Sequence, residues 1–400
     1  MPKPYEAVRI SDRVHWVGAI DWEIRSFHGY GTPRGTTYNA YLITGEKVIL
    51  VDTVKAPFRE ELLSRVASVV DPGDVSAIVS NHSEMDHSGS LVEMVDIIRP
   101  EAIYASPMGK KALEANLHGG IDVTVVKDGE TLTIGDATLS AVHTAMIHWP
   151  DSMFTFLQED GVLFSQDGFG MHLASTERFD DELDPALLEY EAAKYYANIL
   201  LPYSPLIKKL VSRMGELDLP VKVVAPDHGP VWRSSIARVM GLYEGWAEQR
   251  PTRKAVIIYD TMWHSTEKMA HVIADGLTAE GVSTRVLPLG SSERSDVAAE
   301  VLEAGALLVG TPTMNNNLFP SLADSLTYLK GLRPKNLVGA AFGSYGWSGE
   351  AVDQANAALE EMGVELVSPG LKVVYVPDEE ALLACRELAA KVAARLPAAT

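Results

Sequence analysis

Cysteine is almost absent from this sequence of 400 residues, which has only Cys385. A single cysteine excludes a disulfide within the chain and any metal centre built on Cys-x-x-Cys pairs. The residue lies in the helical pattern "EEALLACRELAAKVAARL", where we interpret it as a small apolar residue on a buried face. Any metal bound by this chain must therefore be held by nitrogen and oxygen atoms.

Runs of basic residues and long apolar runs are also absent. The formal net charge is −20, and Lys and Arg form no cluster. Nucleic-acid-binding proteins collect these residues to neutralise phosphates, so we expect no nucleic-acid partner. No stretch reaches the eighteen or so uninterrupted apolar residues of a membrane span. The start, "MPKPYEAVRISDRVHWVG", has no basic segment followed by an apolar one, which predicts no secretion signal and a cytoplasmic protein.

What the chain has is enough apolar residues, 46%, to bury the cores of two domains. In the first 250 residues, strand-like runs such as "KVILVDT", "VSAIVSNH" and "GVLFSQD" alternate with helical patterns such as "REELLSRVASVV". This mixture predicts an α/β domain over residues 1–250, with sheets covered by helices.

A polar segment with a proline, "AEQRPTRK", marks a linker near residues 247–254. After it, strands and helices alternate regularly. The strands are "KAVIIYD", "STRVLPLG", "ALLVGTP", "LVGAAFGS" and "LKVVYVP". Five strands with helices between them predict a doubly wound parallel sheet over residues 251–400.

The densest chemistry is in "NHSEMDHSG", residues 81–89, directly after a strand-like run. Four side chains that can bind a metal, His82, Glu84, Asp86 and His87, fall within six positions. Three further strand-like runs also stop at or just before a potential ligand, namely His148, Asp167 and His228. Because the carboxyl ends of strands gather functional groups at one sheet edge, these seven residues are candidates for one metal site.

The series His-x-Glu-x-Asp-His, followed by His148, Asp167 and His228, resembles the metallo-β-lactamase fold and, within it, the flavodiiron proteins. The stretches "VGAIDWEIRSFHGY", "HWPDSM", "YYAN" and "DTMWHSTEKMAH" carry the resemblance through nearly the whole chain. It implies an N-terminal αββα domain followed by a flavodoxin-like domain. Zinc hydrolases of the fold have His-x-His-x-Asp-His, so Glu84 replaces their second histidine.

Three carboxylates and four imidazoles form a harder, more anionic donor set than the zinc version, and suit iron or manganese. The resemblance implies one iron on His82, Glu84 and His148, a second on Asp86, His87 and His228, and Asp167 bridging them. Asp227 is a candidate partner of a ligand. The resemblance also implies that His28 and Tyr196 line the pocket for a diatomic substrate, where they could hydrogen-bond it or supply protons.

After the strand "KAVIIYD" comes "TMWHSTEKMAHVIADGL", which is neither a P-loop nor a GxGxxG dinucleotide motif. The hydroxyls of Thr261, Ser265 and Thr266 lie at an expected helix N-terminus, which suits a phosphate dianion. Two later loops, "GTPTMNNNLFP" and "FGSYGWSGE", lie at the same expected sheet edge. This arrangement resembles flavodoxin and implies FMN, with Met262, Trp263, Asn315 and Trp347 as candidates to flank the ring. The predicted cofactor-binding residues are Thr261, Met262, Trp263, His264, Ser265, Thr266, Pro312, Thr313, Met314, Asn315, Asn316, Asn317, Gly343, Ser344, Tyr345, Gly346, Trp347 and Gly349.

The resemblance implies reduction of dioxygen to water, of nitric oxide to nitrous oxide, or both, at a diiron site supplied with electrons through FMN. Both gases need the same open site, so these residues do not separate them. The lone cysteine excludes a fused rubredoxin, so a separate rubredoxin is the expected donor and a reduced deazaflavin the alternative. The family also implies a head-to-tail homodimer or a dimer of dimers. Two other hypotheses are a zinc-dependent hydrolase of the same fold and a flavin electron carrier with a metal-free N-terminal scaffold.

Overall fold

The computed structural model describes residues 4–118 and 120–398 of the chain. It forms two compact units. The first takes in most of the chain up to Glu244, and the second runs from Gly245 onward and includes two short segments, His28–Gly31 and Tyr196–Ser204. The predicted boundary between residues 250 and 251 stays a prediction. Its outer limits, residues 1 and 400, and the first three residues of the expected non-secretory start lie outside the described residues.

The first unit is built on two sheets. The seven-stranded sheet contains, in spatial order, β1 (Val8–Arg9), β2 (Val14–Trp16), β7 (Tyr41–Ile43), β8 (Val48–Val51), β9 (Val75–Ser80), β10 (Ala102–Ala105) and β11 (Thr124–Val125). The five-stranded sheet contains β12 (Thr131–Ile134), β13 (Ala137–His143), β14 (Met153–Leu157), β15 (Val162–Gln166) and β16 (Val223–Pro226). Shorter strands are β3 (Ala19–Asp21), β4 (Ser26–Phe27), β5 (Tyr30–Gly31) and β6 (Thr36–Tyr38).

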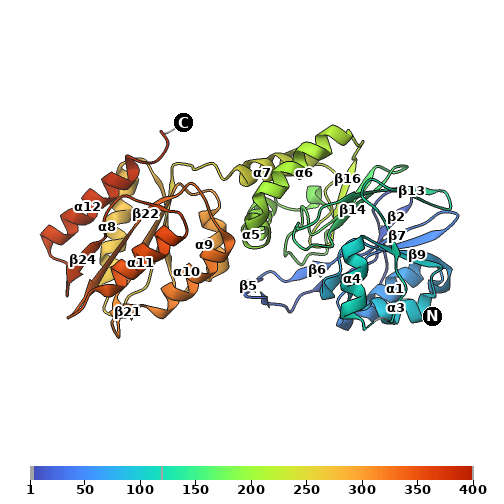
Figure 1. The fold of residues 1–400 in the computed structure, drawn as a ribbon, viewed down its shortest axis with the longest axis horizontal. Helices are drawn as coiled ribbons and strands as arrows, with labels where there is room; N and C mark the ends of the chain where they lie inside the picture. Colours follow the sequence, from blue (N-terminus) through green and yellow to red (C-terminus); the bar gives the residue numbers. More distant parts are fainter. Residues whose placement is uncertain (1–3, 119, 399–400) are drawn as a thin grey trace. The chain divides into compact units, whose positions relative to one another are not determined.

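Helices cover the outer faces of these sheets. Within this unit, α1, α3 and α4 lie on one side of the sheets, and α6 and α7 lie on the other (Figure 1). The α-helices are α1 (Arg59–Val69), α2 (Met85–Ser88), α3 (Leu91–Ile98), α4 (Pro107–Asn116), α5 (Pro185–Tyr195), α6 (Ser204–Leu217) and α7 (Ile236–Glu248). The short helices are η1 (Ala56–Phe58), η2 (Pro72–Asp74), η3 (Asp180–Glu182), η5 (Leu201–Tyr203) and the π-helix η4 (Tyr196–Leu200).

Two apolar layers hold the first unit together. One lies between the sheets and joins residues such as Val51 and Ile43 of the first sheet to Leu139 and Phe164 of the second. The other packs the first sheet against helices, with contributions from Leu62 and other helix residues. Strands buried on both faces read as continuous apolar runs, as β8 ("VILV") and β14 ("MFTFL") do. The predicted αββα layering is confirmed.

The second unit contains a parallel sheet with strand order β18-β17-β19-β22-β23, and β24 also pairs with β22. This order belongs to doubly wound sheets, so the prediction of that fold is confirmed. The strands are β17 (Lys254–Tyr259), β18 (Ser283–Pro288), β19 (Ala306–Gly310), β22 (Val338–Tyr345), β23 (Glu365–Leu366) and β24 (Leu371–Val374), with a hairpin of β20 (Thr313–Met314) and β21 (Asn317–Leu318). The helices are α8 (Ser265–Ala279), α9 (Arg294–Val301), α10 (Pro320–Leu332), α11 (Glu350–Glu361) and α12 (Glu379–Ala393).

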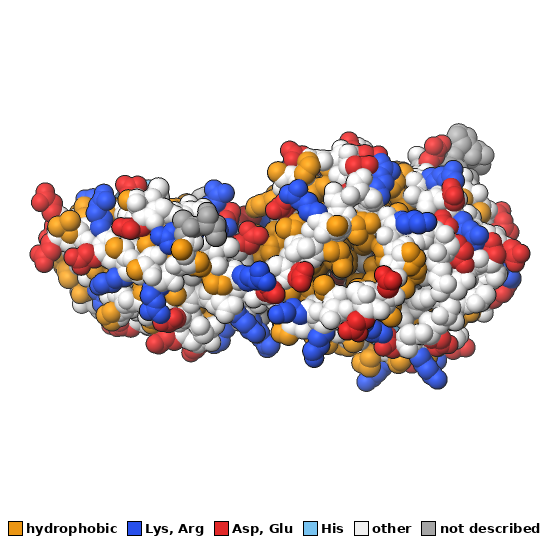
Figure 2. Space-filling model, turned by 90° about the horizontal axis from the view of Figure 1, so that it is seen from above, with side chains coloured by type: hydrophobic (Ala, Val, Ile, Leu, Met, Phe, Trp, Pro, Cys, Tyr) orange, Lys and Arg blue, Asp and Glu red, His pale blue; other side chains and the backbone are white. Residues whose placement is uncertain are grey.

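The surface carries no continuous basic area on the face drawn in Figure 2, where Lys and Arg side chains lie among Asp and Glu. This mixture agrees with the net charge of −20, while the absence of a nucleic-acid partner stays a prediction. Among the described residues, no helix is both long enough and apolar enough to span a bilayer.

Candidate functional site

Four loops at strand ends bring the seven predicted metal-binding side chains together in the first unit. The segment after β9 carries His82 and Glu84 and leads into α2, which holds Asp86 and His87. The loop between β13 and β14 carries His148, and the segments after β15 and β16 carry Asp167 and His228. The side chains form two groups whose donor atoms lie within 4.8 Å of one another, His82–Glu84–His148–Asp167 and Asp86–His87–His228.

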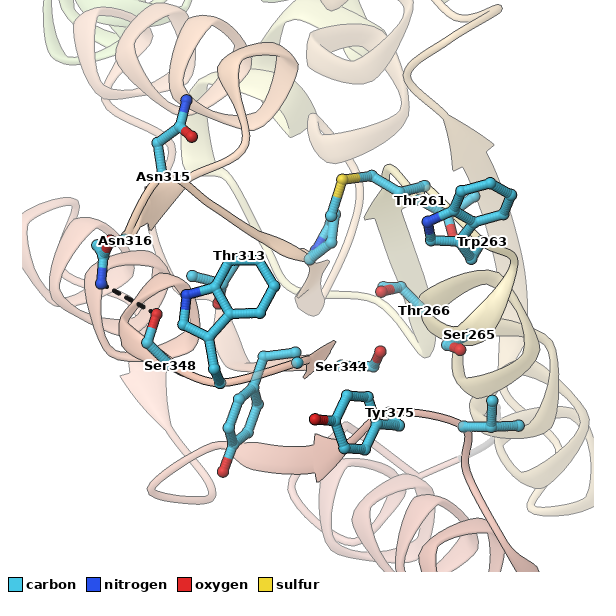
Figure 3. Close-up of a pocket in the computed structure, with 16 residues that line it drawn as sticks. Thr261, Trp263, Ser265, Thr266, Thr313, Asn315, Asn316, Ser344, Ser348 and Tyr375 are labelled. Atoms are coloured by element: carbon cyan, nitrogen blue, oxygen red, sulfur yellow. Dashed lines mark hydrogen bonds between the residues drawn. The ribbon is translucent and has the colours of Figure 1, made fainter.

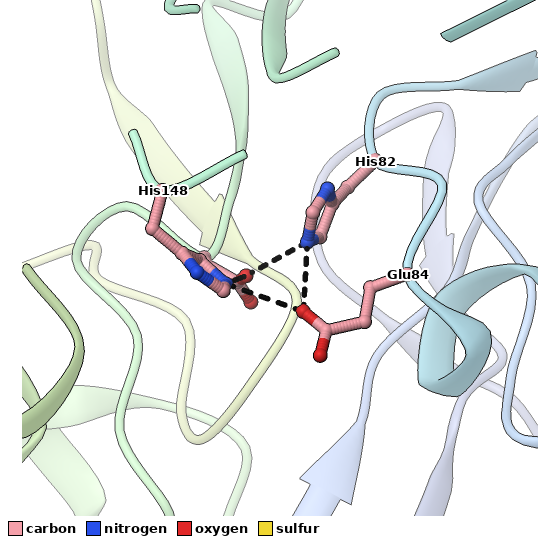
Figure 4. A group of neighbouring side chains, drawn as sticks. His82, Glu84 and His148 are labelled. Atoms are coloured by element: carbon pink, nitrogen blue, oxygen red, sulfur yellow. Dashed lines mark hydrogen bonds and ion pairs between the residues drawn. The ribbon is translucent and has the colours of Figure 1, made fainter. Parts of the chain in front are cut away.

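In the first group, Nε2 of His82 lies 3.2 Å from Oε2 of Glu84, and Nε2 of His148 lies 3.3 Å from the same oxygen (Figure 4). Oδ2 of Asp167 lies 2.8 Å from His148 and 3.2 Å from His82. Donors that each lie about 2.0–2.2 Å from one ion are separated by about 3 Å. The separations in this group therefore fit donors arranged around a single metal ion.

The second group is completed by the other oxygen of Asp167. Nε2 of His228 lies 3.3 Å, and Nε2 of His87 3.4 Å, from Oδ2 of Asp86. Oδ1 of Asp167 lies 3.5 Å from both of these nitrogens. Each carboxylate oxygen of Asp167 thus faces a different group, which is the geometry of a bridging ligand.

The carboxylates and imidazoles of the two groups shift one another's pKa values. Burial lowers the pKa of His87, but Asp86, Asp227 and Asp167 outweigh burial and raise it to about 10. The pKa of His148 is likewise lowered by burial but raised to about 9 overall by Asp167 and Glu84. Burial raises the pKa of Asp167, yet His82 and other imidazoles hold it well below its usual range. The close carboxylates thus favour protonation of the imidazoles, and a metal that binds the imidazole nitrogens must displace those protons.

Asp86 gives a further test of fit. Its side chain is buried, and neither carboxylate oxygen has a hydrogen bond of good geometry within the described part of the chain. A buried carboxylate without such bonds is costly unless a cation satisfies it. This donor set of buried oxygen and nitrogen atoms, with no sulfur, fits iron or manganese.

Two further carboxylates support this site, and one of them, Asp52, was missed from the sequence. Oδ1 of Asp52 accepts the backbone N–H groups of Asn81 at 2.7 Å and His82 at 3.4 Å, which fixes the start of the metal loop. Asp227, the predicted partner of a ligand, has Oδ2 3.7 Å from Nδ1 of His87. Burial, with Asp52 adding to it, raises the pKa of Asp227 well above its usual value. A carboxylate after an apolar strand was the available signal for Asp52, in "VILVDT".

For each of the two predicted substrate-pocket residues, the ring of the adjacent residue in the sequence lies near the candidate metal ligand His228. Tyr196 donates to or accepts from Ser204 through its hydroxyl at 3.0 Å, and its ring packs 5.4 Å from Trp246. The preceding Tyr195 has its ring 5.0 Å from His172 and 6.0 Å from His228. His28 is exposed in the turn between β4 and β5, whereas the ring of Phe27 lies 6.3 Å from His228. The roles given to His28 and Tyr196 stay predictions.

The carboxylates of the candidate metal ligands also affect the pKa of Tyr195. Burial raises the pKa of its phenol well above the usual value, and the carboxylates of Asp167, Asp86 and Glu84 add to the effect. The phenol therefore holds its proton more tightly than an exposed tyrosine does. A buried hydroxyl that keeps its proton beside a metal group can donate a hydrogen bond there.

The second candidate site is a cavity of about 470 Å³ at the carboxyl edge of the parallel sheet (Figure 3). Its volume is in the range of cofactor and drug-sized ligand sites. The residues that line it are Thr261, Met262, Trp263, Ser265, Thr266, Pro312, Thr313, Asn315, Asn316, Ser344, Tyr345, Gly346, Trp347, Ser348, Tyr375 and Val376. Three of these, Ser348, Tyr375 and Val376, were not predicted.

Five predicted residues do not line the cavity: His264, Met314, Asn317, Gly343 and Gly349. The His264 ring pairs with Glu267, and the amide of Asn317 donates to the carbonyl of Asn315 at 2.9 Å. Gly343 serves strand packing, because a Cβ there would lie 1.8 Å from the Thr311 carbonyl oxygen. Contact of these five residues with a cofactor stays a prediction.

The loops around the cavity are shaped by residues that tolerate left-handed backbone. Asn315 and Asn316 have φ values of 50° and 59°, a region in which asparagine is enriched. Oγ1 of Thr261 is buried and has no hydrogen-bond partner within residues 4–118 and 120–398. It lies in the turn before α8, where backbone N–H groups and the helix dipole favour an anion. A terminal phosphate fits this turn.

Comparison with known proteins identifies both units. Residues 36–229 match the ODP family beta lactamase model, and residues 257–388 match the flavodoxin model. The nitric oxide reductase of Moorella thermoacetica is 45% identical over 98% of this chain and 99% of that protein. The rubredoxin-oxygen oxidoreductase of Megalodesulfovibrio gigas is 43% identical over 93% of this chain and 94% of that protein.

Solved structures agree along the whole chain. The rubredoxin oxygen:oxidoreductase from Desulfovibrio gigas superposes with a TM-score of 0.95 at 42% identity, over 98% of this chain and all of that one. The flavodiiron protein from Giardia intestinalis gives a TM-score of 0.95 at 32% identity, over 99% of this chain and 98% of that one. With both domain models in order along one chain and these relatives matched nearly end to end, the chain belongs to the flavodiiron protein family.

Proposed function

We propose that the two groups of side chains in the first unit hold the two irons of this flavodiiron protein. His82, Glu84 and His148 would bind one iron. Asp86, His87 and His228 would bind the other, and Asp167 would bridge them. The observation that carries this assignment is Asp167, since its two oxygens face different pairs of imidazoles at 2.8–3.5 Å.

The chain is an oxidoreductase with a diiron centre and FMN as cofactors. It reduces dioxygen to water, which takes four electrons and four protons, or two nitric oxide molecules to nitrous oxide and water, which takes two of each, or both. The irons supply the redox chemistry at which the gas is reduced. The protein's contribution is to hold seven donors in a buried pocket and to keep a protonated phenol, that of Tyr195, within the field of the ligands.

For FMN, we propose that the turn before α8 takes the phosphate through Thr261, Ser265 and Thr266. The buried hydroxyl of Thr261 supports this assignment. The ring would lie between the loops that carry Trp263 and Trp347, which are 87% and 88% exposed and free to cover a flat heterocycle. FMN can pass on electrons singly, as the irons require.

A separate rubredoxin is proposed as the electron donor, on the strength of the name of the Megalodesulfovibrio gigas relative. The head-to-tail homodimer, or a dimer of dimers, stays a proposal from the family resemblance. The cytoplasmic location, predicted from the start of the sequence, stays a proposal as well. The two highly exposed tryptophans beside the flavin cavity support a partner surface there.

The function is tested with anaerobically reduced full-length protein and a recombinant rubredoxin system. We expect about two irons and one FMN per chain, consumption of at least one of the two gases, and a mass in light scattering of at least twice 43.4 kDa. The relative rates with dioxygen and nitric oxide give the substrate preference. A preparation that holds two zinc ions and hydrolyses esters or β-lactams instead would refute this function.

The adjacent tyrosines provide a matched pair for the proton-donating role. We expect Tyr195→Phe to lower the rate of gas consumption about a hundredfold, the lower end of the contribution of a positioned proton donor. Tyr196→Phe should change the rate less than about threefold, because its hydroxyl bonds Ser204. Iron and FMN content should stay at wild-type values in both. A larger loss in the Tyr196 variant would restore the prediction made from the sequence.

A further inference from the structure

The partners of the imidazole rings on their far sides differ between the two metal groups. Nδ1 of His82 lies 3.2 Å from Oδ2 of Asp151, and both side chains are buried, with exposures of 0% and 2%. The same carboxylate oxygen accepts the backbone N–H of Ser83 at 2.6 Å. The Asp151 carbonyl accepts the hydroxyl of Ser106 at 2.7 Å, which ties the residue to the start of α4. Asp151 is thus fixed from both sides in the position where it meets His82.

The second group uses a neutral partner instead. Nδ1 of His228 lies 2.6 Å from the carbonyl oxygen of Thr37, so this nitrogen carries a proton and Nε2 faces Asp86. Nδ1 of His87 is 3.7 Å from Asp227, beyond hydrogen-bond distance. Of these three imidazoles, His82 is the one with a carboxylate within hydrogen-bond distance of Nδ1, the nitrogen opposite the one that faces the other candidate ligands.

We propose that Asp151 is a positioning residue of the metal centre, and that it makes the iron held by His82 harder to reduce than the iron held by His228. This inference rests on the proposed assignment of the ligands. A carboxylate that accepts the Nδ1 proton fixes the tautomer, so Nε2 points to the metal, and it makes the imidazole a stronger donor. A stronger, more anionic donor stabilises the ferric state more than the ferrous state.

The test is the variant Asp151→Asn. Oδ1 of Asp151 has no hydrogen-bond partner among the described residues, while Oδ2 accepts both bonds. An asparagine oxygen in the Oδ2 position can keep both bonds, and the change removes the charge at nearly constant shape. Asp180→Asn is the control for removing a buried carboxylate elsewhere in the same unit. Asp180 accepts the backbone N–H groups of Arg233, Ser234 and Ser235 through both oxygens, so its asparagine loses at least one of these bonds and perturbs the fold more than Asp151→Asn does.

Two readouts other than activity are measured on iron-loaded full chains. The rate at which a chelator removes the first iron should rise 10- to 100-fold in Asp151→Asn, the range typical for mutation of the residue that holds a ligand from outside. The one-electron reduction potentials of the two irons are followed by the electron paramagnetic resonance of the half-reduced centre. They should lie closer together in Asp151→Asn than in the wild type. A tenfold loss of preference for ferric iron corresponds to a rise of about 59 mV for a one-electron step. Asp180→Asn should change neither quantity.

The outcomes separate this inference from the function on which it rests. If wild-type protein binds no iron, the ligand assignment itself fails. If the wild type binds two irons and Asp151→Asn has wild-type chelation rates and potentials, the assignment stands and the role of Asp151 is refuted. Should the variant not fold, the wild-type chain loaded with zinc and labelled with ¹⁵N-histidine decides: a protonated Nδ1 on His82 supports the inference, and a metal-bound Nδ1 overturns it.

Discussion

Replacing Asp167 with alanine abolishes the diiron centre, and we expect gas consumption to fall by at least about a thousandfold. This exceeds the 10- to 100-fold effect expected from losing an outer partner of a ligand. The reason is geometric, because Asp167 is the one side chain of the described residues whose oxygens face both groups of imidazoles. Without it, the remaining donors form two incomplete sets with no shared anion between them. Iron bound per chain, measured after desalting, should fall below one.

The same variant carries its own control. FMN belongs to the other unit of the chain, so its content should stay at the wild-type value and report on folding. Asp167→Asn keeps the shape of the side chain but removes its charge, and should fall between wild type and alanine in iron content. If Asp167→Ala keeps two irons and consumes gas within tenfold of the wild-type rate, Asp167 is not the bridging ligand.

The sequence pointed to the candidate metal-binding residues because their positions follow a local rule. Apolar strands of the first unit end at turns on one edge of the sheet, and a charged or imidazole side chain at such a turn has little reason to be there structurally. His148, Asp167 and His228 were found in this way, and the structure brings them together with His82. Glu84 separated this donor set from that of the zinc enzymes because its chemistry can be judged from the residue type alone.

Contacts that depend on packing could not be predicted in the same way. Asp151 and His82 are 69 positions apart, and only the folded chain brings them within 3.2 Å. Tyr195 and Tyr196 illustrate a second limit. Successive residues of a helix point about 100° apart, so only one of them can face the metal group. The structure passes from α5 into a π-helix at Tyr196, which changes the direction of the side chains in a way that the letters "YY" do not reveal.

In the second unit, too, features that follow a local sequence pattern were predicted and contacts that depend on packing were not. Its doubly wound parallel sheet was predicted from five apolar runs, and the cavity lies at the expected edge. Tyr375 and Val376 were missed although they follow β24 at that edge, so the rule that found the other loops would also have found them. The segments His28–Gly31 and Tyr196–Ser204 pack with this unit although they are remote in sequence, and such non-local packing leaves no signal in composition.

Ser265→Asp should abolish FMN binding, with a loss of affinity of about a thousandfold or more. Ser265 begins α8, where the helix dipole and the hydroxyls of Thr261 and Thr266 favour an anion. A carboxylate there would take the position proposed for the phosphate. Two like charges about 4 Å apart repel by about 4 kcal/mol at an effective dielectric constant of 20, which corresponds to about three orders of magnitude. Fluorescence titration of the apoprotein with FMN measures the affinity.

Ser265→Ala is the control for this substitution, since it removes one hydrogen bond to a charged group and should weaken FMN binding about 10- to 100-fold. Aspartate at a helix N-terminus is itself stabilised by the dipole, so the variant should fold and keep two irons. Gas consumption by Ser265→Asp with reduced rubredoxin should be lost. Irons of this variant that are reduced chemically should still react with gas in a single turnover. An Asp variant that binds FMN within tenfold of wild type would place the phosphate elsewhere, and the hydroxyls of the turn before α8 would then need another explanation.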